Sequence, residues 1–318
     1  MSVYASKSRK NLKGGFRLAR KINVGIIGPG NIGSDLLMKL LRSDKFTVTS
    51  MYGIDNESEG MKRAREKGLK TFGNGIDGIY ELEETERPEI LFDATSAGAH
   101  QYNNKVAQEL GIRMIDLTPA AIGPFVSPSV NLNEFIKENN VNMITCGGQA
   151  TAPIVAAISE VVPVKYAEIV ATISSVSAGP GTRANIDEFT ETTAAALETV
   201  GGAEVGKAII ILNPADPPII MRDTIYTIVD DEFDEAEIIA SVRKREKEIQ
   251  SYVPGFSLRQ DPVIDGDTIA VYVQVEGAGD FLPVYSGNLD IMTASALGVA
   301  ERVADYINEE EAKEVQTN

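Results

Sequence analysis

The sequence predicts an α/β fold made of a parallel-sheet domain and a second α+β domain with an antiparallel sheet. Its 318 residues are enough for two domains of ordinary size. Short apolar runs alternate with helical patterns through the first half, which is the order of a parallel sheet. In the second half, longer strand patterns follow one another and are separated by prolines, as in an antiparallel sheet.

Strand and helix patterns alternate along the first half. The strands are short β-branched apolar runs, and the helices carry their apolar side chains on one face. The expected elements are a strand over 22–28, a helix over 31–44, a strand over 46–55, a helix over 59–68, a strand over 89–97, a helix through 104–111 and a strand over 112–118. Because helices connect the strands, we expect the strands to run parallel.

The second half has fewer helices between its strands. The expected elements are a helix over 151–162, a strand over 166–176, a helix over 186–200, strands over 207–213 and 219–229, a helix over 234–253, a strand over 267–275 and a last helix over 288–307. The breaker "PADPP" separates the two adjacent strands. This order predicts a sheet with helices on one side.

The composition argues against two kinds of partner. A formal net charge of −16 would repel a nucleic-acid backbone, and no basic stripe interleaved with aromatic residues offsets it. The longest apolar runs, such as 207–212, are far shorter than the roughly 20 residues of a membrane span. One cysteine cannot form an internal disulfide, so the fold does not depend on an oxidising compartment.

Residues 1–21 differ from the rest of the chain because they carry many basic side chains and no acid. Such a composition fits a flexible tail or an organellar transit peptide. We favour the tail, outside the folded core, and therefore expect a cytoplasmic protein.

A glycine-rich turn follows the first strand. The motif "GPGNIG" fits G-x-G-x-x-G between a strand and a helix, where glycines let a dinucleotide pyrophosphate approach the helix N-terminus. Asp55 ends the second strand, where an acid binds the ribose hydroxyls and favours NAD over NADP. The alternative is a tight turn with an incidental acid. The candidate cofactor residues here are Gly28, Pro29, Gly30, Asn31, Ile32, Gly33 and Asp55.

This motif indicates that the predicted first sheet is of the Rossmann type. We therefore divide the chain into segments. We expect a basic extension over 1–21, a dinucleotide-binding domain over 22–146 and a catalytic and dimerisation domain over 147–288. The last helix, 289–308, is expected to pack back on the first domain.

Cys146 is the only cysteine of the chain and lies in "NMITCGGQATAP". A free cysteine is often a small buried hydrophobe, and residue type alone favours that interpretation. Its position between a strand-like run and a helix favours a reactive thiol instead, because backbone N–H groups and a helix N-terminus lower a thiol pKa. A thiolate beside a dinucleotide domain suggests aldehyde oxidation through a thioester. No cysteine or histidine stands at ligand spacing, so no metal site is expected.

Three further features are candidates with ordinary alternatives. His100, the only histidine, is a possible base, but a lone histidine at a strand-to-helix junction is more often structural. Asp223 interrupts an apolar strand, either as a base or as a partner of Arg222 or a solvent-facing residue. A glycine-rich loop before a helix is a plausible anion or cofactor contact, or a structural turn: Ser177, Ala178, Gly179, Pro180, Gly181, Thr182, Arg183, Ala184 and Asn185.

Longer blocks of the sequence carry a resemblance to a known family. They include "GNIGSDL", "FDATSAGAH", "IDLTPAAIGP", "NMITCGGQAT", "AEIVATISSVSAGPGTRANIDEFTETT", "NPADPPIIMRDT" and "GNLDIMTASA". In this order, over about residues 22–308, the chain closely resembles the short acylating acetaldehyde dehydrogenases of aromatic and steroid side-chain degradation. Only the basic extension lies outside the match.

The resemblance implies conversion of acetaldehyde, or a slightly longer aldehyde, into its acyl-CoA with NAD and coenzyme A. It implies that Cys146 is the acyl-thioester nucleophile and that Asp223 assists the thiol chemistry. It also implies cofactor contacts from Gly28 to Ile32, from the 177–185 loop and from Asn288. Members of the family form a heterotetramer around a homodimer with a 4-hydroxy-2-oxovalerate aldolase, which passes the aldehyde through an internal channel.

Two competing interpretations stay open. A phosphate-dependent semialdehyde dehydrogenase has the same domain order, but such enzymes usually pair the cysteine with a later histidine, and no histidine follows Cys146. A non-catalytic NAD-binding module would keep Cys146 as core and would show no thiol-dependent turnover.

Overall fold

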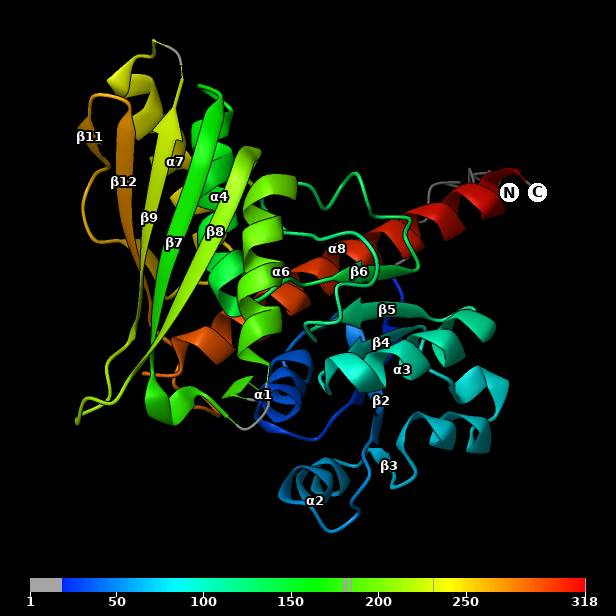
Figure 1. Cartoon of the computed structure of the whole chain (residues 1–318). Coiled ribbons are helices and arrows are strands. Elements are labelled where there is room, and N and C mark those ends of the chain that lie inside the picture. Colours follow the sequence, from blue (N-terminus) through cyan, green and yellow to red (C-terminus); the bar gives the residue numbers. More distant parts are fainter. Residues whose placement is uncertain (1–18, 180–181, 184, 231, 318) are drawn as a thin grey trace, which may run out of the picture.

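The computed structural model describes residues 19–179, 182–183, 185–230 and 232–317. Within these residues the chain forms two six-stranded sheets with helices packed against them (Figure 1). The predicted fold class is confirmed: a Rossmann-type parallel sheet comes first, and an α+β unit follows it.

The first sheet has the strand order β3-β2-β1-β4-β5-β6, and all neighbouring strands are parallel. The strands are β1 (Ile22–Ile27), β2 (Phe46–Tyr52), β3 (Lys70–Phe72), β4 (Ile90–Asp93), β5 (Arg113–Asp116) and β6 (Asn140–Asn142). The connecting helices are α1 (Asn31–Leu40), α2 (Glu59–Glu66) and α3 (Ala97–Glu109), with 3-10 turns η1 (Gly75–Glu81) and η2 (Glu84–Glu86). This order places the turn after β1 at the centre of the carboxyl edge, the usual ligand position in such sheets.

The second sheet has the order β10-β12-β9-β7-β8, and β11 pairs with β12. The strands are β7 (Val164–Ser174), β8 (Ala203–Asn213), β9 (Met221–Val229), β10 (Phe256–Leu258), β11 (Val263–Asp265) and β12 (Thr268–Val275). The helices are α6 (Ile186–Thr199) and α7 (Glu235–Gln250), and η3 (Ser175–Ser177) is a 3-10 turn.

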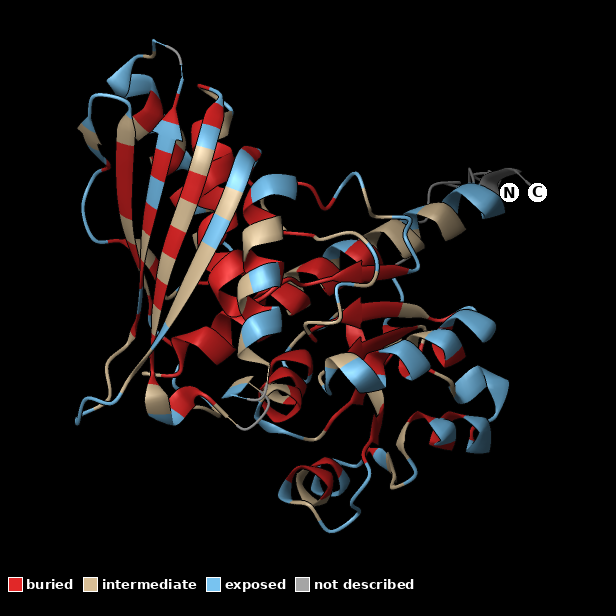
Figure 2. Ribbon diagram, viewed as in Figure 1, coloured by how far each residue is buried: buried red, intermediate tan, exposed pale blue. Residues whose placement is uncertain are grey.

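The second sheet is mixed, whereas the sequence predicted an antiparallel one. β7 and β8 run parallel, and the other pairs are antiparallel. The reason is that α6 lies between β7 and β8 in the chain, so the chain returns to the same end of the sheet before β8 starts. Buried and exposed residues alternate along β9, and Figure 2 shows this alternation as bands on the strands. One face of the sheet therefore packs on helices.

Two helices join the two sheets. α4 (Cys146–Ser159) begins directly after β6 and contacts β7, β9, α6 and α7. All its residues from Cys146 to Ile158 are buried, as expected for a helix that is apolar on every side. α8 (Gly287–Thr317) contacts both α1 and α4, so the last helix packs back on the first sheet domain.

The described end of the basic extension is tied to the fold. Arg20 forms ion pairs with Glu89, next to β4, and with Glu311 of α8. Residues 1–18 of the extension lie outside the described residues. Among the helices that are described, none combines the length and the apolar character that crossing a membrane requires.

Candidate active site

The segment Gly28–Gly33 forms the turn between β1 and α1, and we call it the dinucleotide turn after the sequence motif that it matches. Gly28 has a φ of +100°, and a Cβ on Gly33 would lie 1.9 Å from the Gly28 carbonyl oxygen. The first position requires glycine for its backbone conformation and the second for close packing of the helix on the turn. A Cβ on Gly30, in contrast, would meet no atom within 4 Å. Gly30 therefore borders open space at the N-terminus of α1.

The N-terminus of α1 suits an anionic group. Gly30 is the N-cap, so no side chain satisfies the first N–H groups, and the first turn contains no acid. Asn31 is exposed beside it. Asp55 is exposed just beyond β2, the strand next to β1. Free N–H groups at a helix start and a carboxylate at the neighbouring strand end are the elements that hold pyrophosphate and ribose in dinucleotide folds.

Cys146 is the first residue of α4 and follows the N-cap residue Thr145. Thr145 Oγ1 accepts a hydrogen bond from Gly148 N–H at 3.0 Å and lies 2.6 Å from Thr193 Oγ1 of α6. The backbone N–H groups of Gly147 and Cys146 favour the charged form of the sulfur and act to lower the pKa of the thiol. The thiol thus lies at a helix N-terminus, as the sequence indicated, and it is buried.

Asp223 lies in β9 on the face that packs against α4. Its register partners are Ala171 of β7 and Val273 of β12. A Cβ on Gly147 would lie 3.5 Å from the Ala171 Cβ, so the first turn of α4 rests beside Asp223. Asp223 Oδ1 accepts a hydrogen bond from Thr172 N–H at 3.2 Å. Oδ2 is buried and has no hydrogen-bond partner within the described part of the chain.

The ordinary interpretations of Asp223 do not hold in the structure. Arg222 is exposed and points to the opposite face of the strand, so the two side chains do not pair. Asp223 itself is only 2% exposed, which excludes a solvent-facing role. A buried carboxylate with one free oxygen beside a thiol is instead suited to exchange a proton with it.

The expected lowering of the Cys146 pKa is wrong for this structure. Burial and the Asp223 charge raise the pKa of the Cys146 thiol to about 12, although the N–H groups of Gly147 and Cys146 act in the other direction. Burial also raises the pKa of Asp223 well above its ordinary value. A helix N-terminus contributes up to about 2 kcal/mol, whereas burying an ion costs several kcal/mol. Burial therefore outweighs the helix N-terminus, and the Cys146 thiol stays protonated at neutral pH.

A pH dependence of thiol reactivity follows from this pKa. Because only the thiolate reacts, alkylation of Cys146 by iodoacetamide should rise about tenfold per pH unit, and with a pKa of about 12 the rise should continue from pH 7 to pH 10. An ordinary thiol, with a pKa of about 8.5, levels off in this range. Rates measured by mass spectrometry on the protein without cofactor check this, and a plateau near pH 9 would contradict it.

The predicted cofactor loop after β7 is described in part. Ser177 and Ala178 are buried. Arg183 folds back on the loop, where its Nε donates to the Ala178 carbonyl at 3.0 Å. A Cβ on Gly179 would meet no atom within 4 Å, so the loop borders open space there. Thr182 and Asn185 are half-buried, and Pro180, Gly181 and Ala184 lie outside the described residues.

Asn288 lies in the first turn of α8. Its side chain is 1% exposed, and within the described residues its Oδ1 has no hydrogen-bond partner. Further along α8, Asp290 accepts a hydrogen bond from Lys39 Nζ of α1 at 2.8 Å, and Thr293 Oγ1 donates to Asp35 Oδ2 of α1 at 2.5 Å. These buried contacts hold the start of α8, and with it Asn288, against the helix that begins at the dinucleotide turn.

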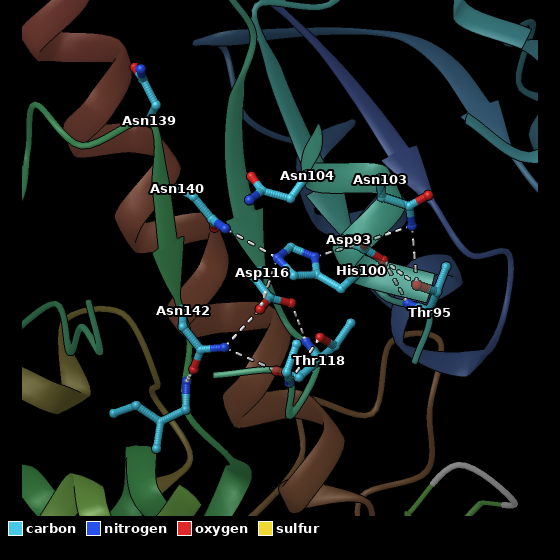
Figure 3. A network of polar contacts seen from close by, with 12 residues as sticks. Asp93, Thr95, His100, Asn103, Asn104, Asp116, Thr118, Asn139, Asn140 and Asn142 are labelled. Carbon is cyan, nitrogen blue, oxygen red and sulfur yellow. Dashed lines mark hydrogen bonds and ion pairs between the residues drawn. The ribbon is translucent and has the colours of Figure 1, made fainter. Parts of the chain in front are cut away.

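His100 lies in α3 and is fully buried. Its Nδ1 is 2.9 Å from Asp93 Oδ2 and its Nε2 is 3.3 Å from Asp116 Oδ2, within a network of polar side chains (Figure 3). Burial raises the pKa of Asp116 to about 6, although the charge of His100 opposes this shift. The arrangement favours the structural interpretation of His100 over a catalytic one.

Sequence reasoning did not single out Thr145, Thr193 or Asn142. Thr145 could have been found, because a threonine directly before a glycine-containing helix start is an N-cap signal. Thr193 lies in mid-helix and gave no signal, since its contact with Thr145 depends on the packing of α6 against α4. Asn142, at the end of β6, gave no signal either, since its hydrogen bonds with Asp116 and Ile144 are seen only in the folded chain.

A Rossmann-type sheet with a glycine-rich turn, followed by a buried thiol and carboxyl at the junction with a mixed sheet, defines the class of two-domain oxidoreductases that act on aldehydes. The comparisons with known proteins give the family. The model described as prokaryotic acetaldehyde dehydrogenase, dimerisation, matches residues 146–283. The chain belongs to the acetaldehyde dehydrogenase family, as its relatives show.

The relatives match nearly the whole chain. The acetaldehyde dehydrogenase of Bacillus cereus (strain ATCC 10987 / NRS 248) is 57% identical over 296 residues, which are 93% of this chain and 98% of the relative. That of Geobacillus stearothermophilus is 58% identical over 287 residues, 90% of this chain and 97% of the relative. The family predicted from the sequence is therefore confirmed, and the matched dimerisation domain supports formation of a homodimer.

Solved structures share the fold at low sequence identity. Crystal structures of aspartate semialdehyde dehydrogenase II from Vibrio cholerae, with and without ASA, give TM-scores of 0.59 and 0.61. Both are 13% identical and cover 89% of this chain and 98% of their own. At this identity the likeness concerns the fold alone.

Proposed function

We propose that the chain converts acetaldehyde, or a short aliphatic aldehyde, into its acyl-CoA with NAD and coenzyme A through a thioester on Cys146. One observation carries the proposal: the single thiol of the chain lies buried at the start of α4, beside an aspartate with a buried, unpartnered oxygen. The family relationship supports the aldehyde as substrate.

The residues of the dinucleotide turn fit NAD. The open space at Gly30 leaves room for a pyrophosphate, and the uncapped α1 offers N–H groups to it. Asp55 would bind the adenosine ribose and repel the 2′-phosphate of NADP. The unpartnered Asn288 Oδ1 would bind an amide or hydroxyl of the cofactor, and the 177–185 loop would contact it too. Bound NAD supplies the hydride acceptor.

Asp223 is proposed as the base that activates the thiol. Its Oδ2 takes the Cys146 proton as the sulfur attacks the carbonyl carbon of the aldehyde. A raised pKa makes this carboxylate a stronger base than an exposed aspartate. The N–H groups of Cys146 and Gly147, at the positive end of α4, would stabilise the oxyanion of the hemithioacetal.

Loss of hydride from the former aldehyde carbon converts the oxyanion into an acyl thioester on Cys146, and Asp223 then releases to solvent the proton that it took from the thiol. The coenzyme A thiol, with Asp223 as base, then attacks the thioester carbonyl, so that acyl-CoA leaves and the Cys146 thiol is restored. Burial of Cys146 limits access of water, which would otherwise hydrolyse the thioester.

Assembly and context belong to the same proposal. We propose a heterotetramer in which a homodimer of this chain binds a 4-hydroxy-2-oxovalerate aldolase, with the aldehyde channelled between them during aromatic or steroid catabolism in the cytoplasm. The dimerisation domain matched by residues 146–283 supports the homodimer, and the resemblance stated from the sequence supports the rest.

NADH formation tests the proposed reaction. The protein is given NAD and acetaldehyde with coenzyme A, with phosphate, or with neither. Rapid turnover only with coenzyme A supports the proposal. Turnover with phosphate would instead favour a semialdehyde-type enzyme that makes an acyl phosphate, and NAD binding without turnover of any aldehyde would favour the non-catalytic module.

Gly30→Ala tests the NAD site without disturbing the fold. The added methyl group meets no protein atom, so the melting temperature should stay close to that of the wild type. It would fill the space assigned to pyrophosphate, so the KM for NAD should rise about 10- to 100-fold, the equivalent of about 1–3 kcal/mol for an overpacked contact. Gly98→Ala, at the equally open start of α3, is the control. If Gly30→Ala and Gly98→Ala had the same KM for NAD, the pyrophosphate would not bind at Gly30.

A further inference from the structure

A cluster of buried polar side chains lies at the carboxyl ends of β4, β5 and β6, and the proposed reaction does not use it (Figure 3). We call it the His100 cluster; its buried members are Asp93, His100, Asn103, Asp116, Thr118, Asn140 and Asn142, and the exposed Thr95 bonds Asp93 at its border. Asp93 ends β4, Asp116 ends β5 and Asn142 ends β6. The cluster is thus built where three neighbouring parallel strands end, directly before the chain turns into α4.

The aspartates hold the cluster in one arrangement. Asp93 Oδ2 faces His100 Nδ1 at 2.9 Å, and His100 Nε2 lies 3.3 Å from Asp116 Oδ2. Asp116 Oδ2 also accepts a hydrogen bond from Asn142 Nδ2 at 2.8 Å. Asp93, His100, Asp116 and Asn142 have no exposed surface. A buried network with this many satisfied contacts is rigid, because each broken bond would leave a polar group without water.

Asn142 connects the His100 cluster to the turn before Cys146 through hydrogen bonds. Its Nδ2 donates to Asp116 and to the Thr118 carbonyl, which fixes the orientation of the amide. Its Oδ1 is thereby directed at the next turn and accepts a hydrogen bond from Ile144 N–H at 2.7 Å. The contact from residue 142 to residue 144 closes an Asx-type turn.

Ile144 has a backbone conformation that this residue type avoids. Its φ is +62°, in the left-handed region, where a β-branched side chain is an outlier. Such a conformation persists only where the surroundings enforce it. Two contacts hold Ile144 in this conformation: its side chain is buried, with 1% exposed, and its N–H donates a hydrogen bond to Asn142 Oδ1. The next two residues are Thr145, the N-cap of α4, and Cys146.

We propose that Asn142, oriented by Asp116 and His100, is a positioning residue that holds the strained turn at Ile144 and so fixes the Cys146 sulfur against Asp223. This role rests on the proposed function of Cys146 as the nucleophile. Without the bond from Asn142, Ile144 relaxes toward an ordinary negative φ, and the first turn of α4 shifts. The sulfur then loses its alignment with the base, while the dinucleotide turn after β1 is unchanged.

Variants of Asn142 test this role. Asn142→Ala removes the acceptor, and because small misplacements of reacting groups cost up to about 100-fold, kcat should fall about 10- to 100-fold. The Kd for NAD should stay unchanged. Asn142→Ser keeps a hydroxyl that closes the same turn more weakly, so its kcat should lie between those of Asn142→Ala and the wild type. Asn103→Ala is the matched control, because Asn103 is a buried amide of the same cluster that bonds Asp93 and Thr95.

Alkylation of the only cysteine gives a second readout that does not need turnover. A relaxed turn exposes the Cys146 thiol, so iodoacetamide should react several-fold faster with Asn142→Ala than with Asn103→Ala, while kcat moves in the opposite direction. A purely structural role predicts similar kcat and alkylation rates in Asn142→Ala, Asn142→Ser and Asn103→Ala, and that result would overturn the proposal. If Asn142→Ala does not fold, Asn142→Ser decides: wild-type kcat and wild-type alkylation would overturn it as well.

Cys146→Ala separates this role from the proposed function. If that variant still turns over, the proposed nucleophile is wrong and the positioning role falls with it. If it is inactive while the Asn142 variants match Asn103→Ala, only the positioning role is wrong.

Discussion

Replacement of Cys146 by alanine is expected to lower kcat by at least about 10⁴-fold, because no other group can form the thioester. The chain has no second cysteine to take over the reaction. The loss should be in turnover and not in folding, since the alanine methyl group replaces a small buried side chain. Steady-state NADH formation with saturating acetaldehyde, NAD and coenzyme A measures it.

Two controls make the result specific to the sulfur. The Kd of Cys146→Ala for NAD, measured by titration calorimetry, should equal that of the wild type, and its melting temperature should change little. Residual turnover within tenfold of the wild type would show that the thiol is core and that oxidation follows another route.

Asp223→Asn has the second largest expected effect. A general base contributes about 10²- to 10⁴-fold, so kcat should fall by about that factor. The amide keeps the size of the carboxylate but cannot take the Cys146 proton. Alkylation of Cys146 at alkaline pH should move in the opposite direction, because the Asp223 charge helps to raise the pKa of the thiol. Slower turnover with faster alkylation is the signature of this pair.

Asp265→Asn is a suitable control for the charge change, since Asp265 is an exposed aspartate in β11 of the same sheet. Its kinetics should match those of the wild type. If Asp223→Asn also retained the wild-type kcat and its pH profile, the carboxylate would have no part in proton transfer.

The parallel sheet and the dinucleotide turn could be predicted because their signals are local. Apolar runs bounded by glycines define β1 and β2, and the spacing of Gly28, Gly30 and Gly33 follows from the geometry of the turn itself. β3 and β6 were not predicted in this form because three residues are too few to show a period. The parallel pairing of β7 with β8 was missed, although the helix predicted over 186–200 between the two strands implies it, because a strand reached through a helix starts from the same end of the sheet.

The site was predictable as a set of residues and not as an electrostatic environment. The sequence placed Cys146 at a helix start, which the structure shows, but it implied a lowered pKa for the thiol. That expectation failed because burial and the proximity of Asp223 arise from packing of α4 on β7 and β9. The positive φ of Ile144 was equally invisible, since nothing in an isoleucine predicts a left-handed backbone.

The central claim is that Cys146 carries the acyl group between oxidation and transfer to coenzyme A. The most direct test is the intact mass of the protein after incubation with acetaldehyde and NAD in the absence of coenzyme A. We predict that one acetyl group is added, that peptide mapping places it on Cys146, and that addition of coenzyme A removes it as acetyl-CoA. NADH formation without any acyl group on Cys146, or an acyl group that coenzyme A does not remove, would contradict the account.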